Sequence, residues 1–340
     1  MSLRGMAVAA WLGLLPLMFS LVVPYELDEF HAQNDFSTPY SGIATFAHLN
    51  WTNCFDPAAD AIFLCLQSMD HGTNPFRSWA SVVDCGDIAN TPFDKLEALQ
   101  QLEASWKLIG SRKSLNSQKA DHVRFLLFGG DHTIILPALR ALYPTWGKVA
   151  ILHFDSYLDI WDPKQLSGGL TKYSEVTHGS MLYIAHEEGL LVETGNMHLG
   201  SRSMLMEEHY NLDNDARCGF TAIRARQIDQ ISIDGIVKQV SDTAGDSLVY
   251  ISIDNDSLDP AFAPATGTIE PGGWTTRELL EILNRLSTAN LPIIGADIVE
   301  FPPVYNNAAE TTALTITQIA YELLQWMVRV PVRVAEKTEL

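Results

Sequence analysis

The chain has 340 residues, with 22 Lys and Arg against 41 Asp and Glu, which gives a formal net charge of −19 with His neutral. This acidic surplus argues against nucleic acid or an anionic membrane surface as a partner, because phosphate binding needs an excess of Lys and Arg. It fits a soluble protein, or one whose ligand is cationic. The length allows one large α/β domain or two ordinary ones, and it is sufficient for a core without disulfides. The four cysteines allow three pairings, and free thiols remain open as the alternative.

Residues 1–23 have the pattern of a targeting segment. Arg4 is the only charge before Glu26, and the run from Met6 to Val23 is almost entirely apolar. A short basic start followed by an apolar stretch is typical of a secretory signal peptide. The run is also close to the length of a membrane span, so a retained anchor stays open as the alternative to cleavage. We expect a secreted glycoprotein, because a glycosylation sequon follows at Asn50.

The remaining chain predicts one α/β domain at residues 61–332, between a polar arm at 24–60 and a short tail at 333–340. Strands are predicted at 61–65, 123–128, 149–154, 248–253 and 293–299, and helices at 93–109, 276–286 and 314–330. Thr275 and Glu278 have capping-box spacing at the start of one helix. The alternation of strands and helices implies a mostly parallel sheet with helices on both faces.

Acidic residues or a histidine follow four of these predicted strands. They lie in the segments GGDHT at 129–133, DSYLD at 155–159, DNDSLDP at 254–260, and at Glu300. Ligands of parallel sheets bind beyond the carboxyl ends of the strands. A single Asp in such a place is most often a helix N-cap, but carboxylates that converge from several strands repel one another unless a divalent cation lies among them. Carboxylates with imidazole suit Mn²⁺, Zn²⁺ or Fe²⁺, so the sequence indicates a metal site.

Six motifs resemble those of the ureohydrolase family, which comprises arginases, agmatinases and their relatives. They are GGDHT (129–133), HFDSYLD (153–159), THGS (177–180), HLGSR (198–202), SIDNDSLDPAFAPATGTIEPGG (252–273) and ADIVEFPP (296–303). The resemblance is strongest to fungal agmatinases and covers roughly residues 40–330. It implies a three-layer αβα sandwich with a central, mostly parallel sheet of about eight strands, assembled as a homo-oligomer.

The resemblance also implies a manganese-dependent hydrolase that releases urea and an amine from a small cationic guanidino compound such as agmatine. Two Mn²⁺ ions share a hydroxide that attacks the guanidinium carbon in this family. The metal ligands of the family correspond to His132, Asp155, Asp159, Asp254 and Asp256. Asp155, Asp254 and Asp256 correspond to ligands of the second ion. The catalytic residues correspond to Asp159, to His178 as the proton shuttle and to Glu300 as the acid that pairs with the guanidinium.

Two departures from the family pattern favour an alternative. Tyr157 stands where the second ion expects an imidazole, and a phenol is a poor ligand at neutral pH. His153, inside the strand before Asp155, is interpreted as a core histidine or as one that supports the ligands, rather than as a ligand. A loop and helix of the family are missing between residues 61 and 87. The alternative is therefore a catalytically impaired or inactive homologue with one metal site instead of two. The sequence does not distinguish agmatine, arginine and guanidinobutyrate as substrates.

Overall fold

The computed structural model describes residues 74–166, 171–205 and 208–333. The predicted signal segment, the polar arm with its sequon and the predicted strand at 61–65 lie outside the described residues. About half of the stretch at 61–87 in which the family loop is missing, and nearly all of the tail, lie outside them as well. No helix within the described ranges is long and apolar enough to cross a membrane.

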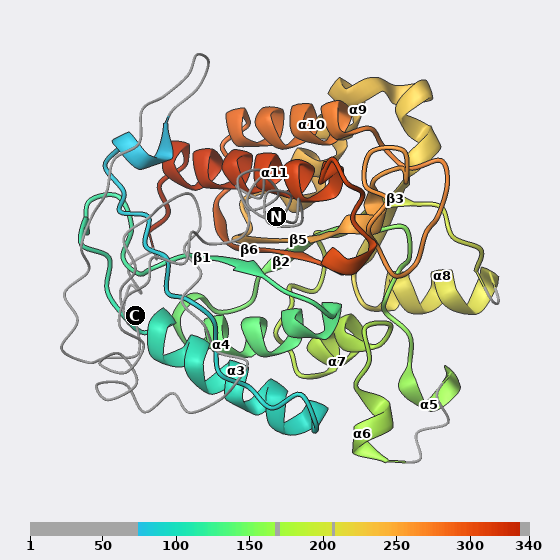
Figure 1. Cartoon of the computed structure of the whole chain (residues 1–340), viewed down its shortest axis with the longest axis horizontal. Helices are drawn as coiled ribbons and strands as arrows, with labels where there is room; N and C mark the ends of the chain where they lie inside the picture. Colours follow the sequence, from blue (N-terminus) through green and yellow to red (C-terminus); the bar gives the residue numbers. More distant parts are fainter. Residues whose placement is uncertain (1–73, 167–170, 206–207, 334–340) are drawn as a thin grey trace, which may run out of the picture.

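The described residues form one six-stranded sheet in the order β1-β6-β5-β2-β3-β4 (Figure 1). All five strand pairings are parallel, which confirms the predicted sheet. The strands are β1 (Phe125–Phe128), β2 (Ala150–Phe154), β3 (Asn196–Ser201), β4 (Phe220–Arg224), β5 (Val249–Asp254) and β6 (Ile293–Val299). The described ranges thus hold six strands where the resemblance implied about eight. β3 and β4 are additions to the predicted set, because polar residues interrupt the apolar pattern of both.

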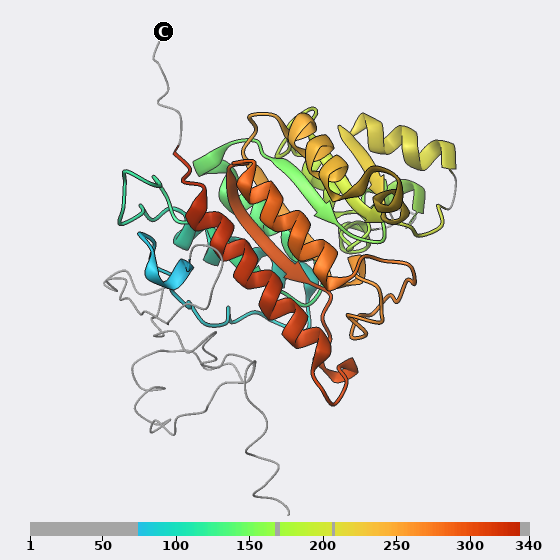
Figure 2. The same cartoon turned by 90° about the horizontal axis from the view of Figure 1, so that it is seen from above.

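Helices cover both faces of the sheet, as the three-layer prediction requires. The longer helices are α3 (Lys95–Gly110), α4 (Ile135–Trp146), α7 (Met181–Glu187), α8 (Glu208–Arg217), α9 (Ile228–Ala244), α10 (Thr276–Thr288) and α11 (Thr311–Arg329). Two single-turn helices, α5 (Pro163–Leu166) and α6 (Lys172–Glu175), lie between β2 and α7. Figures 1 and 2 show α9, α10 and α11 on one face, and Figure 1 shows α3, α4 and α7 on the opposite face. Each layer packs through its own hydrophobic cluster against the sheet.

Local signals in the sequence explain where the covering helices begin. Asp94 caps α3 by accepting hydrogen bonds from the backbone amides of Leu96 and Glu97 at 2.9 and 3.1 Å. The predicted capping box of α10 is present, because Thr275 and Glu278 each accept the other's backbone N–H. Such caps satisfy amides that have no partner inside the helix.

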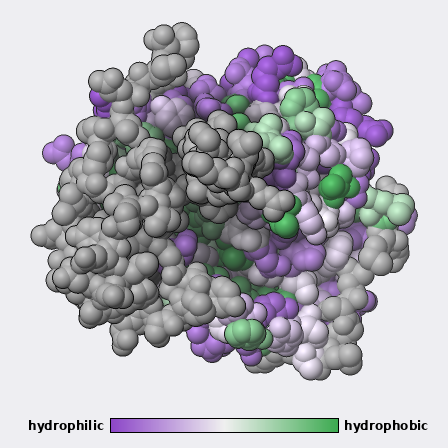
Figure 3. Space-filling view, viewed as in Figure 1, coloured by the Kyte–Doolittle hydropathy of each residue, from purple (hydrophilic) through white to green (hydrophobic). Residues whose placement is uncertain are grey.

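The described surface gives little further indication of function. Figure 3 shows mainly hydrophilic side chains on the described part of one face, with isolated hydrophobic ones among them. Cys218 is a buried free thiol, whereas Cys85 is disulfide-bonded. Several charged side chains are buried rather than exposed, and they lie together at one end of β2, β5 and β6.

Candidate metal centre

The candidate site lies at the carboxyl ends of four strands that are neighbours in the sheet. His132 opens the short helix η3 (His132–Ile134) shortly after β1, and Asp155 directly follows β2. Asp254 is the last residue of β5, and Asp256 lies in the turn η5 (Asn255–Ser257) that follows it. These four side chains are 0–3% exposed. Parallel packing therefore brings residues from distant parts of the chain to one sheet edge.

The distances between the side-chain nitrogen and oxygen atoms of this cluster are those expected between atoms that bind the same metal ion. His132 Nδ1 lies 3.4 Å from Asp155 Oδ2, 3.7 Å from Asp159 Oδ2 and 3.3 Å from Asp254 Oδ2. Ligand atoms of His132, His153, Asp155 and Asp159 all lie within 4.8 Å of one another, as do those of Asp155, Asp254 and Asp256. The five predicted metal ligands are thus brought together in two groups that share Asp155.

Three buried atoms at the centre of the cluster lack a hydrogen-bond partner among the described residues. They are His132 Nδ1, His153 Nε2 and Asp155 Oδ2. Buried polar atoms are otherwise almost always paired, because an unpaired one costs the full desolvation penalty. A cation between these atoms satisfies all three at once, so the donor set fits a metal ion.

The pKa values of the cluster describe an excess of negative charge in a buried place. Burial and the neighbouring Asp155 raise the pKa of Asp254 to about 7. Burial and the charge of Asp254 raise the pKa of Asp256 to about 9. Burial and Asp155 also raise the pKa of Asp159 well above its usual value. Burial opposes a charged His132, but Asp155 and Asp254 outweigh it and raise its pKa well above the ordinary value. When no divalent cation is bound, protons therefore neutralise part of the negative charge of the cluster.

A buried hydrogen-bond chain on β5 and β6 orients His132. Ser252 Oγ donates to Asp297 Oδ1 at 2.6 Å, and the hydroxyl of Tyr250 donates to Asp297 Oδ2 at 2.7 Å. Because Ser252 has one proton to give, its oxygen accepts from Nε2–H of His132, 2.7 Å away. When His132 is neutral, as a metal ligand must be, its lone pair is therefore on Nδ1, which faces the carboxylates. Such support beyond the ligands fixes the tautomer that a metal needs.

Arg202 holds the loop that carries Asp256. Its guanidinium donates to five backbone carbonyls, which belong to Gly200, Asp256, Ser257, Leu258 and Glu270. These bonds join the end of β3 to two separate stretches of the long 252–273 motif. Asn255 in the same loop is 1% exposed and donates to Ala265 O at 2.7 Å. Its sequon is therefore buried in the site.

Tyr157 points its hydroxyl group at a partner outside the metal ligands. The hydroxyl donates to Glu270 Oε1 at 2.7 Å. Burial and the Glu270 carboxylate raise the pKa of this phenol above its ordinary value, which disfavours the phenolate that a metal would bind. Tyr157 is thus held as a neutral hydrogen-bond donor.

Glu300 and His178 lie beside the cluster in more open places. Glu300 Oε1 accepts the backbone N–H of His132 at 2.8 Å, and burial raises the pKa of the carboxyl group. A Cβ atom on Gly267 would lie 3.9 Å from the second oxygen, Oε2, so Gly267 lies beside this oxygen at van der Waals distance. His178 is exposed in the turn before α7, and its charge acts on Glu300. Both Asp159 and Glu300 have a left-handed backbone, with φ of 49° and 57°.

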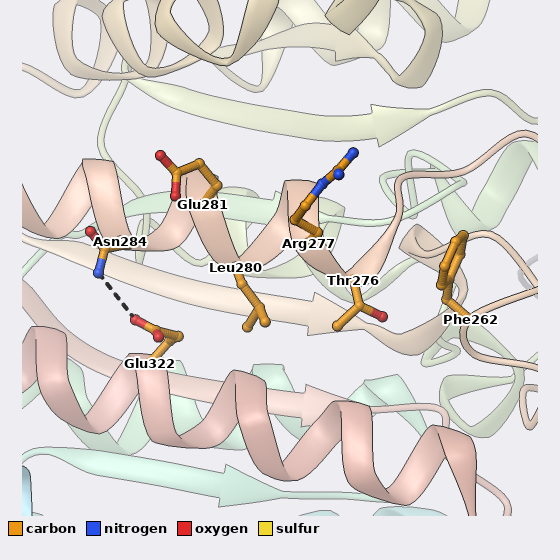
Figure 4. Close-up of a pocket in the computed structure, with 7 residues that line it drawn as sticks. All are labelled: Phe262, Thr276, Arg277, Leu280, Glu281, Asn284 and Glu322. Atoms are coloured by element: carbon orange, nitrogen blue, oxygen red, sulfur yellow. Dashed lines mark hydrogen bonds between the residues drawn. The ribbon is translucent and has the colours of Figure 1, made fainter. Parts of the chain in front are cut away.

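A groove elsewhere on the surface does not belong to this site. It encloses about 520 Å³ next to helices α10 and α11 and is lined by Phe262, Thr276, Arg277, Leu280, Glu281, Asn284 and Glu322 (Figure 4). None of these residues is part of the His–Asp cluster.

Sequence reasoning missed the residues that support the ligands. Ser252, Asp297 and His198 lie inside buried strands, where the apolar pattern hides them. One pattern in the sequence could have indicated Ser252. Ser252 and Asp254 are two positions apart in an otherwise apolar strand, so their side chains lie on the same face of the sheet.

Known proteins share this fold and these sequence patterns. A profile described as "Arginase family" matches residues 58–325. Putative agmatinase 1 of Schizosaccharomyces pombe is 45% identical over 268 residues, which cover 76% of this chain and 67% of that relative. Putative agmatinase 3 of the same yeast is 39% identical over 355 residues, covering 91% and 85%. The structure of proclavaminate amidino hydrolase from Streptomyces clavuligerus is similar with a TM-score of 0.62 at 30% identity, covering 73% of this chain and 76% of that one.

An αβα sandwich with a buried His–Asp cluster at the carboxyl edge of its sheet is the architecture of an α/β metalloenzyme. The family profile and the two yeast relatives each match most of the chain, so they identify a particular family within this class. The chain belongs to the arginase family, as its motifs predicted.

Proposed function

We propose that the chain is a manganese-dependent ureohydrolase that cleaves a small guanidino compound of the agmatine type into urea and an amine. The observation that carries this proposal is the buried cluster with its three unpartnered ligand atoms. The similarity to proteins named agmatinase supports the substrate class. A donor set of carboxylates and imidazoles without thiolate supports Mn²⁺ among the divalent metals.

His132, Asp155, Asp159, Asp254 and Asp256 would hold the metal. When bound, divalent ions lower the pKa of water enough to supply a nucleophile at neutral pH. The protein excludes bulk water from this place, because four of the five side chains are at most 3% exposed and Asp159 is 4% exposed. Burial also strengthens every electrostatic interaction in the site.

We assign the binding of the guanidinium group to Glu300. One of its oxygens accepts the amide of His132, and the other lies beside Gly267. A carboxylate with a free oxygen suits the flat, cationic guanidinium. The exposed His178 lies close enough to act on Glu300 and can pass a proton to the leaving amine.

The alternative of an impaired or inactive homologue is not favoured. The ligand groups are assembled in the described structure despite Tyr157, and the matched relatives include several named agmatinases. The stretch at 61–87 that lacks the family segment, which motivated the rest of this alternative, is described only from residue 74 onward.

Release of urea tests the proposal directly. The protein is loaded with Mn²⁺ and given agmatine, arginine and guanidinobutyrate in turn. We expect urea from at least one of them. The Glu300→Gln variant should lose about 100-fold in kcat/KM, roughly 2.7 kcal/mol, because the charge-assisted pair with the substrate is lost. Glu281→Gln on α10, which is outside the cluster, is the matched control and should retain full activity. Absence of urea from every compound, with metal demonstrably bound, would refute the proposal.

We also propose that the protein enters the secretory pathway and forms a homo-oligomer. The apolar segment at 1–23 and the sequon at Asn50 support the first part. Expression in a eukaryotic host should give a secreted protein whose mobility shifts on treatment with a glycosidase, and retention inside the cell without glycan would contradict this. Light scattering would measure the assembly, and a monomer would contradict the second part.

A further inference from the structure

A second buried hydrogen-bond chain lies on the other side of Asp155, within the sheet. His153 on β2 is directly opposite His198 on β3 in the parallel register. Their Nδ1 atoms are 2.8 Å apart, and His198 Nε2 lies 2.8 Å from Asp215 Oδ1 on α8. Both histidines are fully buried and Asp215 is 3% exposed. Three side chains from three elements thus form one hydrogen-bonded row, and His153 at its end lies next to Asp155.

The row fixes which nitrogen of His153 carries a lone pair. An ionised carboxylate only accepts hydrogen bonds, so Asp215 takes the Nε2–H of His198. When Nε2–H is the only ring proton of His198, its lone pair is on Nδ1, which accepts the Nδ1–H of His153. Neutral His153 is left with its lone pair on Nε2, the nitrogen that faces the metal cluster.

His153 Nε2 has the surroundings of a metal ligand. It lies 3.0 Å from Asp155 Oδ2, and both atoms are buried without a hydrogen bond of good geometry. Two ligand atoms that are each about 2.1 Å from an ion lie about 3.0 Å apart when they meet at a right angle. The nitrogen also lies within 4.8 Å of ligand atoms of His132 and Asp159.

We propose that His153 Nε2 is a ligand of the metal centre, held in the ligand tautomer by His198 and Asp215. This inference rests on the proposed metal centre but not on its catalytic activity. It differs from the sequence-based interpretation of His153 as a core or supporting histidine. It also gives the centre two imidazole nitrogens, from His132 and His153, although Tyr157 is turned to Glu270 and supplies none. His198 and Asp215 are positioning residues, because they act only through His153.

Pulsed EPR of the Mn²⁺-loaded protein, with ¹⁵N-labelled histidine, counts the imidazole nitrogens bound to metal. We expect two metal-bound imidazole nitrogens in the native chain and one in His153→Gln. This variant should also bind Mn²⁺ at least tenfold more weakly than the native chain. His198→Asn should also lower the affinity, by about tenfold or more. His122→Gln is the matched control, because His122 lies outside the ligand groups, and it should leave both the count and the affinity unchanged.

A second variant keeps the inference testable if His153→Gln does not fold. Tyr157→His restores the family ligand and should raise the native count from two to three. A count of one in the native chain, or an unchanged count in His153→Gln, would overturn the role of His153 while the metal centre itself stands. If the native protein bound no Mn²⁺, the proposed metal centre itself would be refuted.

Discussion

Metal binding by the cluster should release protons, and the structure gives the size of the effect. At pH 7, His132 and Asp256 hold protons when no cation is bound, because the pKa of His132 is raised well above its usual value and that of Asp256 is about 9. Asp254, with a pKa of about 7, is half protonated. Each of these groups must lose its proton to bind a metal. The release belongs to the coupled cluster as a whole, and we expect about two protons or more in total when the cluster is filled with metal.

The sign of the pH dependence follows from competition between protons and metal. As the pH rises toward these pKa values, fewer protons compete and the affinity for Mn²⁺ increases. Each released proton changes the affinity tenfold per pH unit, or about 1.4 kcal/mol. Two protons therefore give about 100-fold between pH 6 and pH 7, and the slope falls as the pH approaches 9. A group that titrates in this range contributes to the slope only while it is protonated.

Calorimetric titration with Mn²⁺ measures this slope. It is carried out at pH 6.0, 6.5 and 7.0, in two buffers with different ionisation enthalpies, so that the protons are counted independently of the affinity. The Asp256→Asn variant should reduce the count by about one, because the amide has no proton to lose. An affinity that changes less than threefold per pH unit, with no buffer dependence of the heat, would refute the reasoning.

Two further predictions concern the loop that carries the ligands. Arg202→Met should lower the free energy of unfolding by at least about 3 kcal/mol in urea denaturation, because several backbone carbonyls lose their donor. Arg285→Met on α10, where the side chain is 41% exposed, serves as control. Equal denaturation midpoints for both variants would contradict the tethering role. Gly273→Ala should cost about 2 kcal/mol or more, because its Cβ would lie 2.6 Å from the backbone nitrogen of Asp259. Gly130→Ala, whose Cβ meets no atom within 4 Å, should cost much less, so a similar thermal shift for the two variants would be evidence against this steric reason.

The sequence predicted the strands that are apolar throughout and missed those that are not. The run at 149–154 was predictable because β2 is buried on both faces by helices. β3 was not predictable, since Asn196 and His198 are polar at alternate positions and bond to buried partners that only the fold supplies. α9 was missed as well, because it buries only Ile236, Val240 and Ala244 and so carries a weak apolar pattern.

For the candidate site, the sequence identified side chains at strand ends but not their long-range partners. Asp155 and Asp254 follow apolar runs, and the topology of a parallel sheet brings such ends together. The hydroxyl of Tyr157 bonds to Glu270, which is 113 positions further along the chain. The guanidinium of Arg202 reaches carbonyls more than 50 positions away. No local pattern encodes such contacts, because they depend on how the loops fold over the sheet edge.

The left-handed backbone at Asp159 restricts what evolution can place there. Among residues other than glycine, only Asn and Asp adopt this conformation with little penalty, because their short polar side chains bond locally. A metal that prefers oxygen and imidazole accepts Asp, Glu or His at the same position. Aspartate alone satisfies both demands. Substitution of Asp159 is therefore limited both by the backbone conformation and by metal binding. Replacement by Glu would violate the first requirement and replacement by Asn the second, although both changes look conservative.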